Sequence, residues 1–462
     1  MAKKLLLLLL VVASVSGQEP VPSERFYQAI RSDDLLALGR LVKQFGVDAR
    51  DSLGQTPLMV AVAFGSSGAV DLLLKAGADP KAAASSGATA LHWSRGDADK
   101  VRLLLDRGAD INARSQLGRT PLIVAAASTG SAEVVRMLLA KGAEVNTADN
   151  TGATPLMEAT TAGQEDVVRL LLDRGANVNP KDSGVPGMAS LVGSPLSAAA
   201  LHGNADLVRL FLSKGAQVNA VSAANNVVKN GPIAFGNVTA LHMAAAGGSV
   251  DVARILLDAG AVVDARDVRG VTPLTFAVAT DRPEPSLVRL LIERGADKTL
   301  RSNVGESPID WARKYNNPVI LAELQLEPAA NPVASHAEPT SAGSSRVAVE
   351  RSLRILRTTS SRMLATGGCV ACHAQPVTGL AVATARAHDA SIAPPEQESL
   401  EIKAVLSSGT PLMLQTVSTP GTPDGAIYAA MMLSTMNVPS SISTDALVHG
   451  LLAKQHADGS WA

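Results

Sequence analysis

The chain has 462 residues, of which 46% are hydrophobic and 18% are charged, with a formal net charge of −1 at pH 7. This apolar content is ample for a buried core, and the length is too great for one compact domain. The near-neutral charge gives no indication of a nucleic-acid partner. Aromatic residues make up only 3% of the chain, so the core must consist mainly of leucine, valine and alanine.

Residues 1–17 have the pattern of an export signal peptide. Lys3 and Lys4 precede an unbroken apolar run over residues 5–12, and residues 15–17 supply the small side chains of a cleavage site. The apolar run is far shorter than the ~20 residues of a membrane-spanning helix. We therefore expect cleavage near Gly17 and a periplasmic or secreted protein, with no integral membrane span once the signal is removed.

The segment 118–146 contains the unit from which residues 24–325 are built. Thr120 is placed to cap a helix that begins at Pro121, where the missing N–H of proline is no loss. A second helix with one apolar face is predicted over residues 132–141, and Gly142 is placed to cap its C-terminus. Such a unit cannot bury its apolar face alone, so it implies neighbours of the same kind.

The same start string recurs along the chain. It begins at Thr56, Thr89, Thr120, Thr154, Ser194, Thr239, Thr272 and Ser307, at intervals of 31 to 45 residues. A Gly-Ala pair follows each of the first seven, at Gly77, Gly108, Gly142, Gly175, Gly215, Gly260 and Gly295. The period, the TPLH-like string and the helix–turn–helix pattern resemble ankyrin repeats over residues 24–325.

This resemblance implies a mainly α fold, an ankyrin-repeat solenoid of helix–turn–helix units with β-hairpin loops. About seven internal units would lie between an N-terminal cap at residues 24–50 and a C-terminal cap at residues 306–324. The 31-residue interval after Thr89 predicts that this repeat has lost two residues in its first helix or in the turn that follows. The long intervals predict insertions in hairpin loops near residues 180–193 and 220–237.

The resemblance also implies that another protein is the partner, bound on a face of hairpin tips and inner helices. The partner-binding candidates near the tips are Ser52, Gln55, Gln116, Arg119, Asn150, Arg269 and Glu306. The two insertions would widen or partly cover this face, or they are surface loops without a role. His92 and His242 stand at the fourth position of the TPLH string, where structural hydrogen bonds are expected rather than ligand binding.

Residues 326–345 are rich in proline, alanine, serine and glycine, which is typical of a linker.

Residues 346–462 are expected to form a small all-α domain that looks incomplete. They end in QHADGSW, which matches the Q-x3-G-x-W motif of the squalene/hopene-cyclase and prenyltransferase toroid families. The segment therefore resembles the start of an α/α-toroid. The acid string DxDD of the cyclases is missing, so we assign no catalytic residue.

The string CVACH lies within this C-terminal region. Cys369 and Cys372 are the only cysteines of the chain, and His373 follows directly. This is the attachment string of haem c, in which two thioethers hold the porphyrin and the imidazole binds the haem iron. Haem is attached outside the cytoplasm in bacteria, in agreement with the export signal. Candidates for the distal iron ligand are His388 and Met436.

Two functions are compatible with the sequence. The first is an exported ankyrin-repeat scaffold that carries haem c for electron transfer or redox sensing. The second is a purely binding protein in which the two cysteines form a disulfide and the cyclase-like tail is truncated. A zinc site would need further ligands from elsewhere in the chain.

Overall fold

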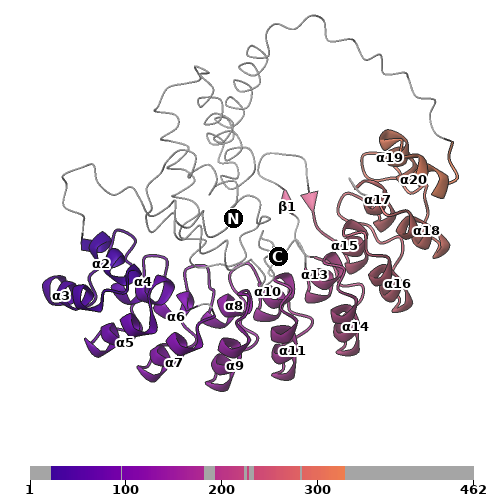
Figure 1. Cartoon of the computed structure of the whole chain (residues 1–462). Helices are drawn as coiled ribbons and strands as arrows, with labels where there is room; N and C mark the ends of the chain where they lie inside the picture. The colour runs from indigo at the N-terminus through magenta and orange to yellow at the C-terminus, as the bar shows by residue number, and fades with distance from the viewer. Residues whose placement is uncertain are drawn as a thin grey trace, which may run out of the picture. The chain divides into compact units, whose positions relative to one another are not determined.

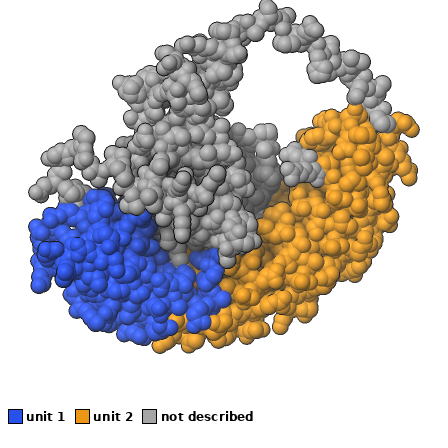
Figure 2. Space-filling model, viewed as in Figure 1, with its two compact units in different colours: residues 1–116, 128–134, 337–462 blue, residues 117–127, 135–336 orange. Residues whose placement is uncertain are grey.

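The computed structural model describes residues 22–94, 96–181, 193–222, 226–227, 234–280 and 283–327. The described residues fall into two compact units, coloured in Figure 2. Unit 1 contains residues 22–116 and 128–134, and unit 2 contains residues 117–127 and 135–327. The predicted signal peptide, almost all of the linker and the whole region 346–462 lie outside the described residues.

Unit 1 consists of helix pairs stacked in chain order (Figure 1). The first helices of the pairs pack against one another, and so do the second helices. In order, the helices are α2 (Pro22–Arg31), α3 (Leu35–Phe45), α4 (Pro57–Phe64), α5 (Ser67–Lys75), α6 (Ala90–Trp93) and α7 (Ala98–Asp106).

Unit 2 repeats this arrangement, and helix α9 has residues in both units. Its helices are α8 (Pro121–Ala126), α9 (Ala132–Ala140), α10 (Pro155–Thr161), α11 (Glu165–Asp173), α13 (Pro195–Leu201), α14 (Ala205–Ser213), α15 (Ala240–Ala246), α16 (Val250–Asp258), α17 (Pro273–Val278), α18 (Pro285–Glu293), α19 (Pro308–Tyr315) and α20 (Pro318–Glu323). Two short strands, β1 (Asn226–Val227) and β2 (Ala234–Phe235), pair antiparallel within the second predicted insertion. The predicted mainly α solenoid of helix–turn–helix repeats is confirmed.

The residues predicted to cap the helices, Thr120 and Gly142, lie at helix ends in the structure. The hydroxyl of Thr120 accepts a hydrogen bond from Ile123 N at 3.3 Å, and Pro121 is the first residue of α8. Helix α9 ends at Ala140, one residue before the predicted end. Gly142 follows with φ of 98°, a backbone conformation that favours glycine.

The predicted shortening of the repeat at Thr89 is also confirmed, because α6 has only four residues. Lys100 stands three residues after the N-cap of α7, where the preceding repeat carries the fully buried Ala69. Its ammonium donates to Val62 O at 3.1 Å and lies 3.3 Å from a carboxylate oxygen of Asp97. A long side chain therefore occupies a core position that is apolar in the preceding repeat, and its charge is compensated there.

The core consists mainly of leucine, valine and alanine, as the composition predicts. The second helices contribute a buried side chain at one repeating position, namely Leu73, Leu104, Leu138, Leu171, Phe211, Leu256 and Leu291. In the C-terminal cap, Asn316 ends α19 in the left-handed conformation and Asn317 caps α20. The described part of the chain contains no helix with both the length and the apolar character that a membrane crossing requires.

Candidate functional site

Several hairpins between repeats are fixed by a polar side chain in the first arm. Asp51 Oδ1 accepts hydrogen bonds from Leu53 N at 2.9 Å and Gln55 N at 2.7 Å. Asp149 and Asp267 make the equivalent pair of bonds in their own hairpins. Burial raises the pKa of Asp51, and the two backbone hydrogen bonds oppose that rise. The carboxylates thus hold each turn in one conformation and define which side chain stands at its apex.

The apex residue is the one before the hairpin glycine, and several of these side chains are exposed and apolar. In unit 2, Leu117 is 42% exposed and Val304 is 82% exposed. In unit 1, Leu53 is 39% exposed. Sequence reasoning missed these residues. The signal that could have found them is the apolar residue immediately before the glycine of a hairpin.

Backbone hydrogen bonds join the apex residue of one hairpin to the residue before the apex of the next hairpin. In unit 2, Asn150 N donates to Leu117 O at 2.9 Å, and Asn303 N donates to Arg269 O at 2.7 Å. A Cβ on Gly270 would lie 2.8 Å from Asn303 Oδ1, so glycine is required for this close approach. We define the tip row of unit 2 as Leu117, Asn150, Arg269 and Val304.

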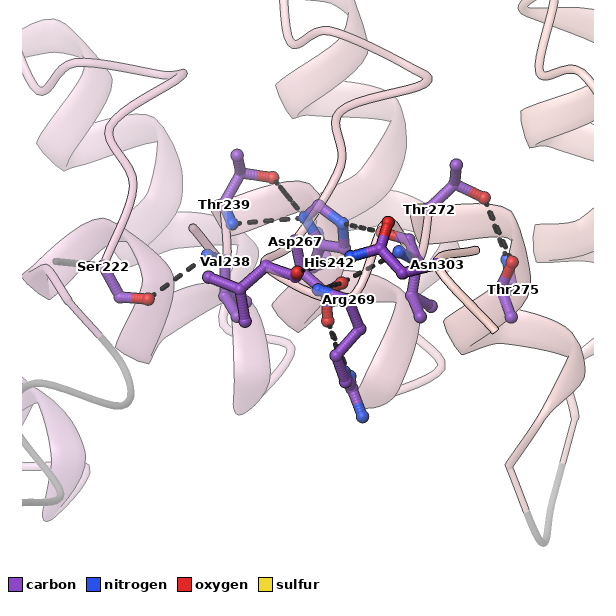
Figure 3. A network of polar contacts seen from close by, with 11 residues as sticks. Ser222, Val238, Thr239, His242, Asp267, Arg269, Thr272, Thr275 and Asn303 are labelled. Atoms are coloured by element: carbon purple, nitrogen blue, oxygen red, sulfur yellow. Dashed lines mark hydrogen bonds and ion pairs between the residues drawn. The ribbon is translucent and has the colours of Figure 1, made fainter. Parts of the chain in front are cut away.

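A network of polar contacts lies beneath part of this row (Figure 3). His242 Nδ1 accepts a hydrogen bond from Thr239 N at 3.2 Å, which leaves Nε2 as the donor to Val271 O at 3.1 Å. The ring of His242 meets Phe276 edge to face at 5.2 Å between centroids. The Arg269 guanidinium lies 5.6 Å from the Phe276 centroid and 2.7 Å from Asp267 Oδ2.

Burial lowers the pKa of His242 to about 4, so the imidazole is neutral at physiological pH. Its two ring nitrogens connect the start of α15 to the next hairpin. In unit 1, His92 Nδ1 likewise accepts from Thr89 N at 3.1 Å. The expectation that both histidines make structural hydrogen bonds is confirmed.

The structure separates the predicted partner-binding residues into two groups. Ser52, Gln116 and Asn150 are exposed, and the side chains of Arg269 and Glu306 are about one-third exposed. Gln55 is 5% exposed and Arg119 is 4% exposed. Arg119 Nε lies 3.2 Å from Asp149 Oδ2, and its Nη2 donates to the carboxylate of Glu158. Because their side chains are buried, we leave Gln55 and Arg119 out of the candidate surface.

Aromatic side chains extend the surface of unit 2 along its last helix pair. Trp311 and Tyr315 stack with ring centroids 6.0 Å apart, and Tyr315 is 50% exposed. The ammonium of Lys314 lies 4.8 Å from the Trp311 centroid and forms an ion pair with Glu306. Exposed aromatic and cationic side chains of this kind are enriched where proteins bind proteins.

Cys369, Cys372, His373, His388 and Met436 all lie outside the described residues. Within the described ranges, no group of three or more His, Cys, Asp or Glu side chains is arranged to hold a metal ion.

The described residues form stacked helix pairs, which are joined by hairpins with exposed apex side chains. This arrangement defines a repeat scaffold of the protein-interaction class. The family model for ankyrin repeats (three copies) matches residues 26–115, 94–182 and 196–302, which together make up more than half of the chain. The chain belongs to the ankyrin-repeat family.

Individual relatives share only part of the chain. A putative ankyrin repeat-containing protein of Treponema pallidum is 39% identical over 82 residues, 18% of this chain and 27% of the relative. A putative ankyrin repeat protein of Rickettsia bellii is 42% identical over 98 residues, 20% of this chain and 41% of the relative. The match therefore spans less than half of each of these relatives. The human ASB11 ankyrin repeat domain is 25% identical with a TM-score of 0.41, covering 52% of this chain and 99% of that domain.

Proposed function

We propose that this chain is an exported protein-binding scaffold that carries covalent haem c for electron transfer or redox sensing. The ankyrin repeats provide the scaffold, since such repeats mediate contacts between proteins. The haem part of the proposal rests on one observation: the only two cysteines of the chain stand in the string CVACH. The export pattern of residues 1–17 supports it, because haem c is attached outside the cytoplasm in bacteria.

The donor chemistry of the string fits haem c. The thiols of Cys369 and Cys372 are three positions apart, which suits two thioether bonds, and the imidazole of His373 suits the proximal iron position. When bound, the group would supply one-electron exchange at its iron. His388 and Met436 are the proposed distal ligands.

The haem proposal predicts a coloured protein. When the full chain is exported in a bacterium that has the haem-attachment machinery, we expect a Soret band that stays with the polypeptide after denaturation. The double substitution Cys369→Ala and Cys372→Ala should abolish that band. A colourless wild-type chain without free thiols would contradict the proposal and support the disulfide alternative.

The binding proposal predicts that partner capture depends on the tip row of unit 2. Val304→Asp and Leu117→Asp place a charge on exposed apolar apex residues, so we expect capture of the same partner to fall about tenfold. Affinity is measured by titrating the partner that the wild-type chain captures. Arg209→Glu is the matched control, because this α14 side chain is exposed and forms an ion pair with the exposed Asp206. Equal capture by all three variants would exclude the tip row as the binding surface.

A further inference from the structure

Three ion pairs of unit 2 stand close to the C-terminal end of the tip row. They are Arg269 with Asp267, Arg301 with Asp310 and Lys314 with Glu306. The cationic side chains are 33%, 63% and 54% exposed, whereas their carboxylate partners are 0%, 31% and 29% exposed. In each pair the positive charge is therefore more accessible to a binding partner than the negative charge.

Two of these carboxylates are held in place by the backbone of their own repeat. Asp267 Oδ1 accepts hydrogen bonds from Arg269 N and Val271 N, both at 2.8 Å. Asp310 Oδ2 accepts from Ser307 N at 2.9 Å and from Ser307 Oγ at 2.8 Å, and these bonds lower the pKa of Asp310. Neither carboxylate can turn outward without losing bonds that fix a hairpin or a helix start, so the difference in exposure is built into the fold.

The three cations are gathered around the hairpin of residues 301–306. Arg301 is the first residue of this hairpin, and Lys314 reaches its last residue, Glu306, from α19. A backbone hydrogen bond of 2.7 Å joins the same hairpin to the carbonyl oxygen of Arg269 in the preceding one. Accessible positive charge is therefore concentrated at one end of the tip row, where it attracts negatively charged groups.

Apolar and aromatic side chains accompany these cations. Val304 stands at the apex of the same hairpin and is 82% exposed. Phe276 and Trp311 occupy equivalent positions of α17 and α19, which pack against each other (Figure 1). The guanidinium of Arg269 lies over the first ring and the ammonium of Lys314 over the second. A ligand that covers this surface fully must offer apolar groups as well as negative charge.

We propose that the C-terminal end of the tip row binds an acidic segment of a partner protein, in which Asp and Glu residues flank a leucine or an aromatic residue. The carboxylates of the segment pair with Arg301 and Lys314, and its apolar side chain packs on Val304. The exposed aliphatic side chain favours a protein segment over a nucleic acid, whose backbone offers phosphates alone. The inference rests on the proposed protein-binding function and names the chemistry of the partner.

Random dodecapeptides displayed on phage and selected on the immobilised full chain test the proposal. We expect the selected peptides to be enriched in Asp and Glu around an apolar residue. When one such peptide is synthesised and titrated against the full chain, the double substitution Arg301→Gln and Lys314→Gln should weaken its binding about tenfold. Glu306→Gln should strengthen binding about threefold, because the carboxylate that competes for Lys314 is removed. A gain of affinity cannot result from damage to the fold.

Arg289→Gln is the matched control in the same unit. Arg289 is 58% exposed and pairs with the less exposed Glu323, but this pair joins the second helices α18 and α20. We expect its removal to leave binding unchanged, and equal weakening by Arg289→Gln would overturn the proposal because net charge alone would explain the effect. Raising the salt concentration should weaken binding to the wild-type chain more than binding to the double variant, since exposed charges are screened.

The remaining outcomes separate this inference from the proposed function. Neutral or basic selected peptides whose binding is lost in Val304→Asp would overturn the acidic partner and leave the binding function in place. Failure to select any peptide, or selected peptides that bind Val304→Asp and the double variant as well as the wild-type chain, would contradict both. Tighter binding of a short oligothymidylate than of the acidic peptide would overturn the proposal in favour of a nucleic acid.

Discussion

Replacing Arg119 with methionine is expected to lower the free energy of unfolding by about 3–5 kcal/mol. The guanidinium is held between Asp149 and Glu158, and the three side chains are 5%, 6% and 11% exposed. Methionine keeps the length and the apolar stem of arginine but removes the charge. Two carboxylates are then left buried without a cation, and burying an unpaired charge is far more costly than losing a surface ion pair.

Urea unfolding of the full chain, followed by circular dichroism, measures this effect. Arg102→Met in α7 is the matched control, because Arg102 and Asp99 form a 2.7 Å ion pair with side chains 56% and 71% exposed. We expect a loss below about 0.5 kcal/mol there. Adding Glu158→Gln to Arg119→Met should recover part of the stability, since a neutral amide replaces an unpaired carboxylate. Equal losses for Arg119→Met and Arg102→Met would show that the buried network contributes little.

The repeat architecture could be predicted because its determinants are local in sequence. Thr120 caps α8 through a hydrogen bond three residues away, and Pro121 fixes the first helical residue. The four-residue α6 follows from a spacing of 31 between two start strings. Caps and helix starts can be recognised within one repeat, and lost residues can be recognised from the spacing of two successive start strings. No knowledge of the contacts between repeats is needed.

The surface could not be predicted in the same way, because it depends on contacts between repeats. Arg119 is polar and lies at a hairpin, so its sequence indicates a surface residue. Its burial arises from Asp149 and Glu158, which are 30 and 39 residues away. Leu117 and Val304 are apolar, so their residue type does not indicate a surface position, yet the turns fixed by neighbouring polar groups place them at the apex. Side-chain direction at a hairpin is set by the backbone conformation rather than by polarity.

Lowering the pH from 7 to 5 is expected to destabilise the repeats by about 2 kcal/mol through His242 alone. The ordinary pKa of histidine is 6.5, and burial lowers the pKa of His242 to about 4 in the folded protein. Between these two values the unfolded chain binds a proton that the folded protein does not bind. The stability that His242 contributes is therefore complete above pH 6.5 and is lost progressively as the pH falls toward 4.

The geometry in Figure 3 explains why protonation is unfavourable in the folded state. Nδ1 already accepts a hydrogen bond from Thr239 N, so a proton on this atom would leave two donors facing each other. Unfolding free energies at pH 7 and pH 5 measure the effect. His242→Asn should remove about 2 kcal/mol of the difference between the two pH values, although it also lowers stability at pH 7 because the bond to Val271 is lost. His202→Asn, at an exposed histidine after α13, should leave most of the pH dependence in place. An unchanged pH dependence in His242→Asn would mean that the ring is not the group whose protonation opposes folding.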